Sequence, residues 1–251
     1  MALGLGLGLG LRYAAKALGF SNLYSLTFDG TDDYIDCGDN NDFSFGDGSS
    51  DSAFSVSMWV KLNAATRQPF CAKAATNKEY HILSGSTDKL RFRLYDQSAS
   101  SAYIQCQLDD VVSTGSWVYY TFTYDGGGNQ SGLTIYANGS SPAQTTSSSG
   151  SYTAMENTTS DLRIASSQMN SFYLNGDMDE VALFDIELSS SQITDIYNSG
   201  TPTDLSSHTG LVGYWRMGDG ATHPTIPDES SNSNDGTMTN MVSGDITIDV
   251  P

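Results

Sequence analysis

Basic residues are scarce in this chain. Lysine and arginine together number 11 against 29 aspartates and glutamates, which gives a formal net charge of -18. A surface that binds nucleic acid needs clustered positive side chains to neutralise phosphates, so we expect no nucleic-acid partner. The excess of acid is typical of a well-solvated surface. It also leaves a cation-binding role open, because hard divalent cations prefer carboxylate and carbonyl oxygens.

Cysteine is rare, and its pattern excludes two common uses. Cys37, Cys71 and Cys106 are odd in number and show no C-x-x-C spacing. Neither a zinc site nor a complete disulfide framework is therefore indicated. Each cysteine lies in an expected strand, so we predict three buried free thiols.

The residue sets of several catalytic classes are missing. His81, His208 and His223 are scattered, and none accompanies a recognisable nucleophile. The glycine-rich residues 125–128 lack the Lys-Ser/Thr signature of a phosphate-binding loop. We interpret them as a hairpin turn between two strands.

The apolar opening of the chain, residues 1–11, is too short to cross a bilayer, which needs about 20 apolar residues. It also differs from a secretion signal, because Arg12 and Lys16 follow the apolar run instead of preceding it. We predict that residues 1–22 form an assembly arm that docks on another subunit, with packing against its own domain as the alternative. In an extended conformation one face of this arm carries every leucine of its Leu-Gly alternation: Leu3, Leu5, Leu7, Leu9 and Leu11.

Short strand patterns fill most of the remaining chain. Residues 24–37 alternate apolar and polar side chains on both sides of a turn at Asp29 and Gly30, which is typical of a β-hairpin. Residues 142–160 are rich in Ser and Thr, and we expect them to form a long exposed loop. Together the patterns predict an all-β protein, a jelly-roll β-sandwich. Further strands are expected at residues 54–62, 70–73, 80–84, 89–96, 102–108, 117–124, 133–137, 161–165 and 179–184.

One short helix is predicted over residues 189–197. Ser189 and Gln192 have the spacing of a capping box, and Ile193, Ile196 and Tyr197 share one helical face. Residues 23–200 then form the sandwich domain.

Four stretches carry a resemblance to a known family. They read SLTFDGTDDYIDC (25–37), FSVSMWVKL (54–62), TGSWVYYTFTYDGGGNQSGLTIYANG (114–139) and LNGDMDEVALFDIELSSSQITDIYNSG (174–200). In this order they resemble the laminin-G-like branch of the concanavalin A-like lectin/glucanase superfamily. The resemblance implies a concanavalin A-like jelly roll with a short helix at residues 189–197. It says little about function, because this fold hosts many unrelated activities.

The C-terminal segment, residues 201–251, departs from the family pattern. Residues 211–241 resemble the stretch that usually opens a laminin-G-like domain, yet here they follow the helix. Either this segment returns to its own sandwich as a permuted strand, which we favour, or it completes a neighbouring copy by strand exchange. In both cases Tyr214 and Trp215 should be buried. The segment ends in an acidic tail.

The carboxylate pattern of the family's glucanases is incomplete. Those enzymes carry Glu-x-Asp-x-Glu or a near variant on one strand, because two carboxyl groups must flank the glycosidic bond. The nearest match, residues 177–182, begins with Asp177 and lacks the last carboxylate. Asp179 and Glu180 are adjacent, and adjacent strand residues point to opposite faces. We therefore predict that the protein is not an enzyme.

Many relatives hold a structural calcium ion near the FDG turn. Carried over to this chain, the resemblance implies Asp29 or the carbonyl of Gly30, with Asp177 or Asp179, as ligands. The alternative is that these acids end strands and accept hydrogen bonds from turn amides.

A glycan-binding face would need exposed aromatic rings. On residues 117–124, one alternating set reads as core, which leaves Trp117 and Tyr119 as candidates for such a face. We interpret Trp59 as a packing residue.

The favoured hypothesis for function is a non-catalytic virion structural protein, in a capsid-decoration, head-fibre or tail role, because small laminin-G-like proteins occur among phage structural proteins. Its partners would be other virion proteins and copies of itself, and it would be made in the host cytoplasm. The alternative is a glycan-binding adhesion module at a cell or virion surface.

Overall fold

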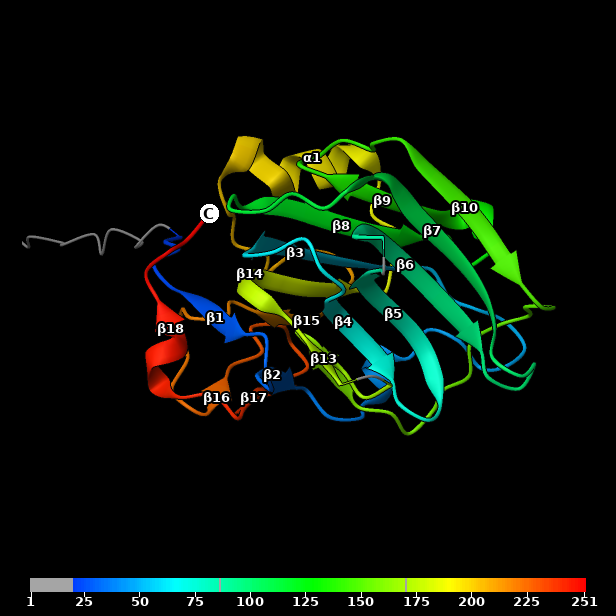
Figure 1. Ribbon diagram of the computed structural model, residues 1–251, viewed down its shortest axis with the longest axis horizontal. Helices are drawn as coiled ribbons and strands as arrows, with labels where there is room; N and C mark the ends of the chain where they lie inside the picture. The colour runs from blue at the N-terminus through cyan, green and yellow to red at the C-terminus, as the bar shows by residue number, and fades with distance from the viewer. Residues whose placement is uncertain (1–19, 86, 170) are drawn as a thin grey trace, which may run out of the picture.

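The computed structural model describes residues 20–85, 87–169 and 171–251. The predicted all-β jelly-roll sandwich is confirmed, because two large antiparallel sheets lie face to face as layers (Figure 1). The predicted assembly arm falls almost entirely outside the described residues, and so do Leu3, Leu5, Leu7, Leu9 and Leu11.

The first layer is a seven-stranded sheet with the spatial order β18-β1-β14-β3-β8-β9, in which β15 also pairs with β14. Its strands are β1 Ser25–Asp29, β3 Phe54–Leu62, β8 Val118–Tyr124, β9 Leu133–Ala137, β14 Asn175–Phe184, β15 Leu211–Trp215 and β18 Ile246–Thr247.

The second layer is a nine-stranded sheet with the spatial order β10-β7-β6-β5-β4-β11-β2-β17-β16. Its strands are β2 Tyr34–Asp36, β4 Pro69–Ala74, β5 Lys78–Ser84, β6 Lys89–Asp96, β7 Ala102–Val111, β10 Gln144–Ser149, β11 Leu162–Ile164, β16 Thr225–Ile226 and β17 Gly236–Thr239. A two-stranded ribbon follows β11 and consists of β12 Ser166–Ser167 and β13 Phe172–Tyr173. Short 3₁₀ turns lie at Asn41–Phe43, Gln130–Gly132, Asn198–Gly200 and Ser243–Asp245.

The main hydrophobic core lies between the two layers. Alternate residues of each strand point into it, so that Phe54 of β3 stacks on Phe45 at 4.3 Å between ring centroids and meets Phe92 of β6 edge-on at 5.6 Å. All three cysteines are free and buried here, as predicted.

The predicted helix is confirmed as α1, Ser190–Tyr197, which lies outside the seven-stranded sheet (Figure 1). The Ser189 hydroxyl accepts from the Gln192 main-chain N–H at 3.4 Å, and the Gln192 side chain accepts from the Ser189 N–H at 3.0 Å. Ile193 and Ile196 are buried against the outer face of the sheet, where they form a second hydrophobic cluster.

The predicted hairpin at residues 24–37 is wrong, although both of its strands exist. β1 pairs with β14 and β18, whereas β2 pairs with β11 and β17 in the other sheet. The turn at Asp29 therefore crosses from one layer to the other. A period of two specifies which side chains point inward, but it does not specify the partner strand.

Residues 211–251 return to the sandwich within this chain. β15 pairs with β14 at Val181–Phe184, in line with β1, which pairs with the other half of the same strand. Tyr214 and Trp215 are fully buried, as predicted. Next, β17 joins β2, and β18 joins β1.

The expected loop at residues 142–160 contains an edge strand. β10 pairs with β7 along its whole length, from Gln144 opposite Leu108 to Ser149 opposite Tyr103. A run of Ser and Thr can serve as an edge strand because its side chains need no cover. Among the described residues, no helix has both the length and the apolar character needed to cross a membrane.

Candidate functional site

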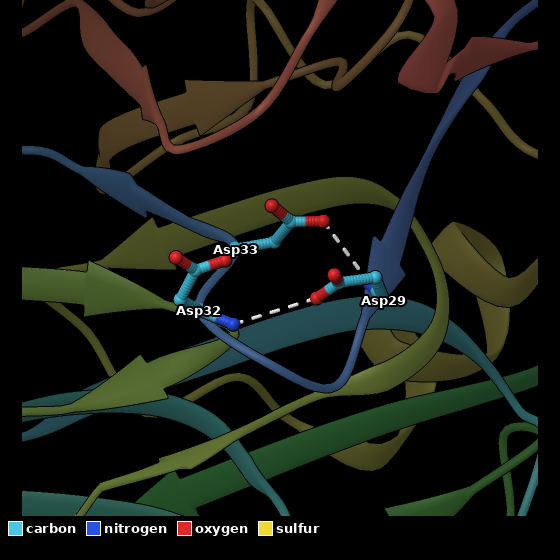
Figure 2. Close-up of side chains that lie close together, drawn as sticks. All are labelled: Asp29, Asp32 and Asp33. Carbon is cyan, nitrogen blue, oxygen red and sulfur yellow. Dashed lines mark hydrogen bonds between the residues drawn. The ribbon is translucent and has the colours of Figure 1, made fainter.

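The turn between β1 and β2 gathers three carboxylates (Figure 2). Oxygens of Asp29, Asp32 and Asp33 lie within 4.8 Å of one another. Asp33 accepts from the main-chain N–H of Asp29 at 3.0 Å, and Asp29 accepts from the N–H of Thr31 at 2.7 Å. Burial, together with the charge of Asp29, raises the pKa of Asp33 to about 6. The carboxyl groups at this turn favour a hard cation as counter-charge.

The structure does not bring the predicted calcium ligands together. Asp29 and Gly30 lie in the turn, but the residue opposite Asp29 on β14 is Asn175. Asp177 stands opposite Thr27 and accepts a hydrogen bond from its hydroxyl at 2.6 Å. Asp177 also forms an ion pair with Lys61. Strand pairing therefore separates Asp177 from the turn.

Asp179 and Glu180 lie farther along β14, at a β-bulge. Pairing with β3 shifts register between Asp179 and Ala182, and Glu180 has a φ of 49°. The prediction that these carboxylates point to opposite faces is wrong, because a bulge breaks the alternation. Asp179 stands opposite Trp59 of β3, and Glu180 accepts a hydrogen bond from the hydroxyl of Tyr214. Both aromatic rings belong to the hydrophobic cluster beneath α1, so both carboxylates lie on that side of the sheet.

Both carboxyl groups are covered by their own chain. The exposed fraction is 0% for Asp179 and 2% for Glu180. Burial raises the pKa of Asp179 well above its usual range, and the charge of Glu180 adds to this shift. Burial also raises the pKa of Glu180 to about 7, although Tyr214 and Arg216 favour its ionised form.

The segment before β1 closes this pair off from solvent. Asn22 donates its amide to Asp179 at 2.7 Å, and Arg216 donates to the carbonyl of Ser21 at 2.7 Å while it binds Glu180 at 3.2 Å. A substrate sugar therefore has no open path to these carboxylates in this conformation.

The prediction that Tyr119 belongs to a glycan-binding face is wrong. Its side chain is only 2% exposed and packs beneath α1 against Trp59 and Tyr197, with ring centroids 5.1 and 6.2 Å away. The packing role predicted for Trp59 is confirmed. Trp117 is half-buried just before β8, where its indole N–H donates to Asp249 of the C-terminal tail at 3.1 Å.

The outer face of the nine-stranded sheet carries a different set of side chains. On β6, Leu90, Phe92 and Leu94 point into the core, so Arg91 and Arg93 point outward. Their cross-strand partners on β7 are Gln107 and Gln105. We call this surface the basic face, defined by Arg67, Arg91, Arg93 and Arg163 with Tyr34, Tyr95, Tyr103, Gln105, Gln107, Phe172 and Tyr173.

Guanidinium groups stack on aromatic rings at three places across this face. Arg93 lies 4.0 Å from the ring centroid of Tyr103, and Arg67 lies 4.6 Å from that of Phe172. Arg163 lies 4.2 Å from the ring centroid of Tyr34. Stacking of this kind holds a guanidinium in a fixed plane while its N–H groups remain available at the edge.

A cleft of about 430 Å³ opens beside the last of these stacks. It is lined by Arg163, Gln168 and Tyr173, with Ser167 and Ser171 from the β12–β13 ribbon. The Nε–H of Arg163 is buried and has no hydrogen-bond partner among the described residues. The cleft thus combines an aromatic ring with several hydrogen-bonding groups.

Sequence reasoning missed the basic face, although a signal was present. The β6 stretch KLRFRLYD alternates Lys89, Arg91 and Arg93 with apolar residues, which places three positive charges on one side of a strand in an acidic chain. The contributions of Arg67, Phe172 and Arg163 could not be seen, because they come from segments far apart in the sequence.

A family model for the concanavalin A-like lectin/glucanases superfamily matches residues 29–194. The chain belongs to this superfamily. The match extends from the turn at Asp29 to α1 and covers every strand of the nine-stranded sheet except β16 and β17.

One solved structure supports the fold, and a second shows a weaker likeness. A "putative carbohydrate binding protein" from Bacteroides ovatus shares 16% identity over 91% of this chain, with a TM-score of 0.62, and this chain spans 60% of its length. Domain 4 of an extracellular arabinanase from Geobacillus stearothermophilus, solved in complex with arabinotriose, shares 22% identity over 60% of this chain and 69% of that chain, with a TM-score of 0.44. A comparison with curated proteins finds no match.

Proposed function

We propose that this protein is a non-catalytic glycan-binding module, and that it binds its ligand on the basic face. The observation that carries the proposal is the cleft beside Arg163, where an aromatic ring and convergent polar groups line an open volume of about 430 Å³. Ligand sites of this size combine apolar walls with a few placed hydrogen-bonding groups. The carbohydrate-binding description of the Bacteroides ovatus protein, which has the same fold, agrees with this proposal.

The chemistry of the cleft suits a sugar. Tyr173 offers an apolar ring with a polar tip, and Gln168 offers both a donor and an acceptor. Arg163 adds a guanidinium group to the lining, which can donate hydrogen bonds to sugar hydroxyls. The buried Asp179–Glu180 pair, by contrast, is closed off by its own chain and has no part in this site.

The test is binding of the full chain to an array of polysaccharides, followed by calorimetry on those retained. Tyr173→Ala should weaken binding about tenfold or more, because it removes the ring of the cleft. Tyr24→Ala is the matched control, since Tyr24 is exposed and lies before β1 in the other sheet. Equal loss in both variants, or no binding by the parent chain, would exclude a glycan site at the cleft.

We further propose calcium at the β1–β2 turn, with ligands different from those implied by the resemblance. Asp29, Asp32 and Asp33 have oxygens close enough to share one ion, whereas Asp177 and Asp179 have other partners. Both Asp29 and Asp33 already accept turn N–H groups, so they are held in place.

Thermal unfolding in calcium and in EDTA tests this proposal. Calcium should raise the melting temperature by mass action, and Asp32→Asn should abolish the rise. Asp32 is chosen because Asp29 and Asp33 hold the turn through their carboxylates. The matched control is Asp110→Asn, at an exposed position of β7. If the melting temperature of the parent chain is the same in calcium and in EDTA, the calcium site is excluded.

An assembly role, such as that of a virion subunit, is a second candidate. It is favoured by exposed apolar side chains beside β1 and β18, which pair with each other. Leu23 is 56% and Ile248 is 80% exposed, and the β1–β18 register places Tyr24 beside Ile248. If this patch joins subunits, deletion of residues 1–19 or Ile248→Asp should reduce the mass measured by light scattering. A monomeric parent chain excludes this role.

A further inference from the structure

The basic face concentrates the few positive charges of this chain. Of the 11 basic residues, Arg12 and Lys16 lie outside the described part, which leaves nine. Six of the nine lie on the face or at its rim: Arg67, Lys78, Lys89, Arg91, Arg93 and Arg163. In a chain with a net charge of -18, such a concentration makes this face electrostatically unlike the rest of the molecule.

Three of these arginines have no carboxylate partner. Among the ion pairs of the described residues, none involves Arg67, Arg91 or Arg93. Burial lowers the pKa of Arg91, and the positive charges of Arg93 and Arg67 lower it further. Burial, together with the positive charges of Arg93 and Arg67, lowers the pKa of His81 on β5 to about 3. The guanidinium groups of Arg67, Arg91 and Arg93 therefore act on one another, and within the described part of the chain no acid forms an ion pair with them.

Neutral side chains hold these guanidinium groups in place. Arg93 donates to Oε1 of Gln105 through Nε at 2.9 Å and Nη2 at 2.6 Å, and Arg91 donates to Oε1 of Gln107 at 2.5 Å. Gly85 leaves room for Arg91, since a Cβ there would lie 2.7 Å from Cζ of the guanidinium. Amide oxygens orient an arginine but leave its charge intact. An anionic ligand would therefore meet a fixed cationic group that loses little side-chain freedom on binding.

We propose that the basic face binds the carboxylate or sulfate groups of an acidic polysaccharide. This inference rests on the proposed function and names the ligand class for the same face. A guanidinium binds carboxylates and sulfate-like oxyanions through paired N–H groups. Arg163 on β11 lies three strand spacings, about 14 Å, from Arg93 on β6, but it is already paired with Asp36 at 3.5 Å. The anionic groups of the ligand are therefore assigned to Arg67, Arg91 and Arg93.

The acidity of the rest of the protein does not prevent this binding. At 0.1 M salt the Debye length is about 10 Å. Repulsion between the ligand and acids farther away than this is largely screened, whereas the attraction at direct contacts on the face is screened less. Binding should therefore weaken as salt rises, since the exposed part of the attraction is itself screened.

The experiment measures binding of the full chain, by calorimetry, to two matched pairs of polymers: polygalacturonate with its methyl ester, and dextran sulfate with dextran. We expect at least one acidic polymer to bind about tenfold or more tightly than its neutral partner. The two pairs distinguish carboxylate from sulfate. A single-stranded DNA oligonucleotide is the third anionic probe and should bind weakly, because the stacked rings of this face are occupied by arginines.

Three variants locate the charge. Arg93→Gln should weaken binding of the acidic polymer about tenfold or more, and Arg93→Lys should lie between this variant and the parent, because it keeps the charge but loses the fork. Lys61→Gln removes the same charge from β3 of the other sheet and should bind as the parent does. Melting curves check that each variant is folded.

The outcomes separate the two proposals. Equal affinity for acidic and neutral polymers, or binding only to neutral glycans, overturns the anionic inference and leaves the glycan-binding function standing. No binding to any saccharide overturns both. DNA that binds as tightly as the acidic polymers overturns the assignment to saccharides.

Discussion

The outer faces of the two sheets are built from similar alternating strands but have different surroundings. On the seven-stranded sheet the outward residues Trp59, Tyr119 and Tyr214 are buried, because α1 and the segments after it cover them. On the nine-stranded sheet no described segment covers the outward residues Arg93 and Tyr103 in this way, and they are charged or amphipathic.

This difference shows where recognition can occur in this fold. Aromatic residues on the covered face stabilise the helix–sheet contact, whereas those on the uncovered face support arginines. An aromatic residue in an outward strand position is therefore not evidence for a ligand site until its cover is known. Four substitutions break or sharpen the comparison, from the largest expected effect to the smallest.

The same change, Tyr→Ala, should destabilise the fold much more on the covered face than on the uncovered face. Tyr119→Ala empties a packed site beneath α1 and should cost about 3 kcal/mol of unfolding free energy. Tyr103→Ala removes a stacked ring on an open face and should cost under about 1 kcal/mol. Urea unfolding measures both values.

Glycan binding should follow the reverse order. Tyr103→Ala should weaken it, because Arg93 loses its support, and Tyr119→Ala should leave it unchanged at temperatures where the variant is folded. If Tyr119→Ala weakened binding more than Tyr103→Ala, the assignment of the two faces would have to be exchanged.

Buried carboxylates on the covered face should make stability depend on pH. Burial raises the pKa of Glu180 from 4.5 to about 7, so the folded state holds its proton more tightly than the unfolded state does. The stabilisation is full below pH 4.5 and is lost as pH rises through 7. Between pH 5 and 8 this group alone should remove about 2 kcal/mol of unfolding free energy.

Glu180→Gln removes that titration, so unfolding in urea should change less between pH 5 and 8 than in the parent chain. Asp33 titrates in the same direction and remains in the variant, so it does not contribute to the difference. The charge of Glu180 also raises the pKa of Asp179, so the difference reports on the coupled pair of Asp179 and Glu180. An unchanged pH dependence in Glu180→Gln would show that Arg216 keeps this carboxyl ionised.

The smallest effect concerns the cap of the covering helix. Ser189→Ala removes the hydrogen bond from the Gln192 N–H to the Ser189 hydroxyl, keeps the one from the Ser189 N–H to Gln192, and should cost about 1 kcal/mol. Ser190→Ala, one residue later and exposed, is the control and should be neutral. Thermal unfolding measures both variants, and equal losses would mean that the box does not contribute.

Local patterns predicted much of the fold. The strands at residues 54–62 and 89–96 and the capping box at Ser189 follow from spacing alone, because side-chain direction in a strand and hydrogen bonding at a helix start are local properties. The hairpin failed for the opposite reason, since pairing of β1 with β14 joins residues about 150 positions apart.

The site was less accessible to prediction than the fold. Tyr119 was misjudged because the alternating pattern identifies an outward residue but not the helix that covers it. The carboxylates Asp179 and Glu180 were misjudged because a bulge, which the pattern does not reveal, changed the direction of one side chain.

By itself, the sequence determined that this chain is an acidic all-β sandwich with three free thiols and one capped helix, because composition and short-range periodicity decide those properties. Only the tertiary structure decided which outer face is covered, which carboxylates share the β1–β2 turn, and how Arg67, Arg93 and Arg163 meet on one surface. These arrangements depend on strand order and on contacts between distant segments, and no local pattern encodes either.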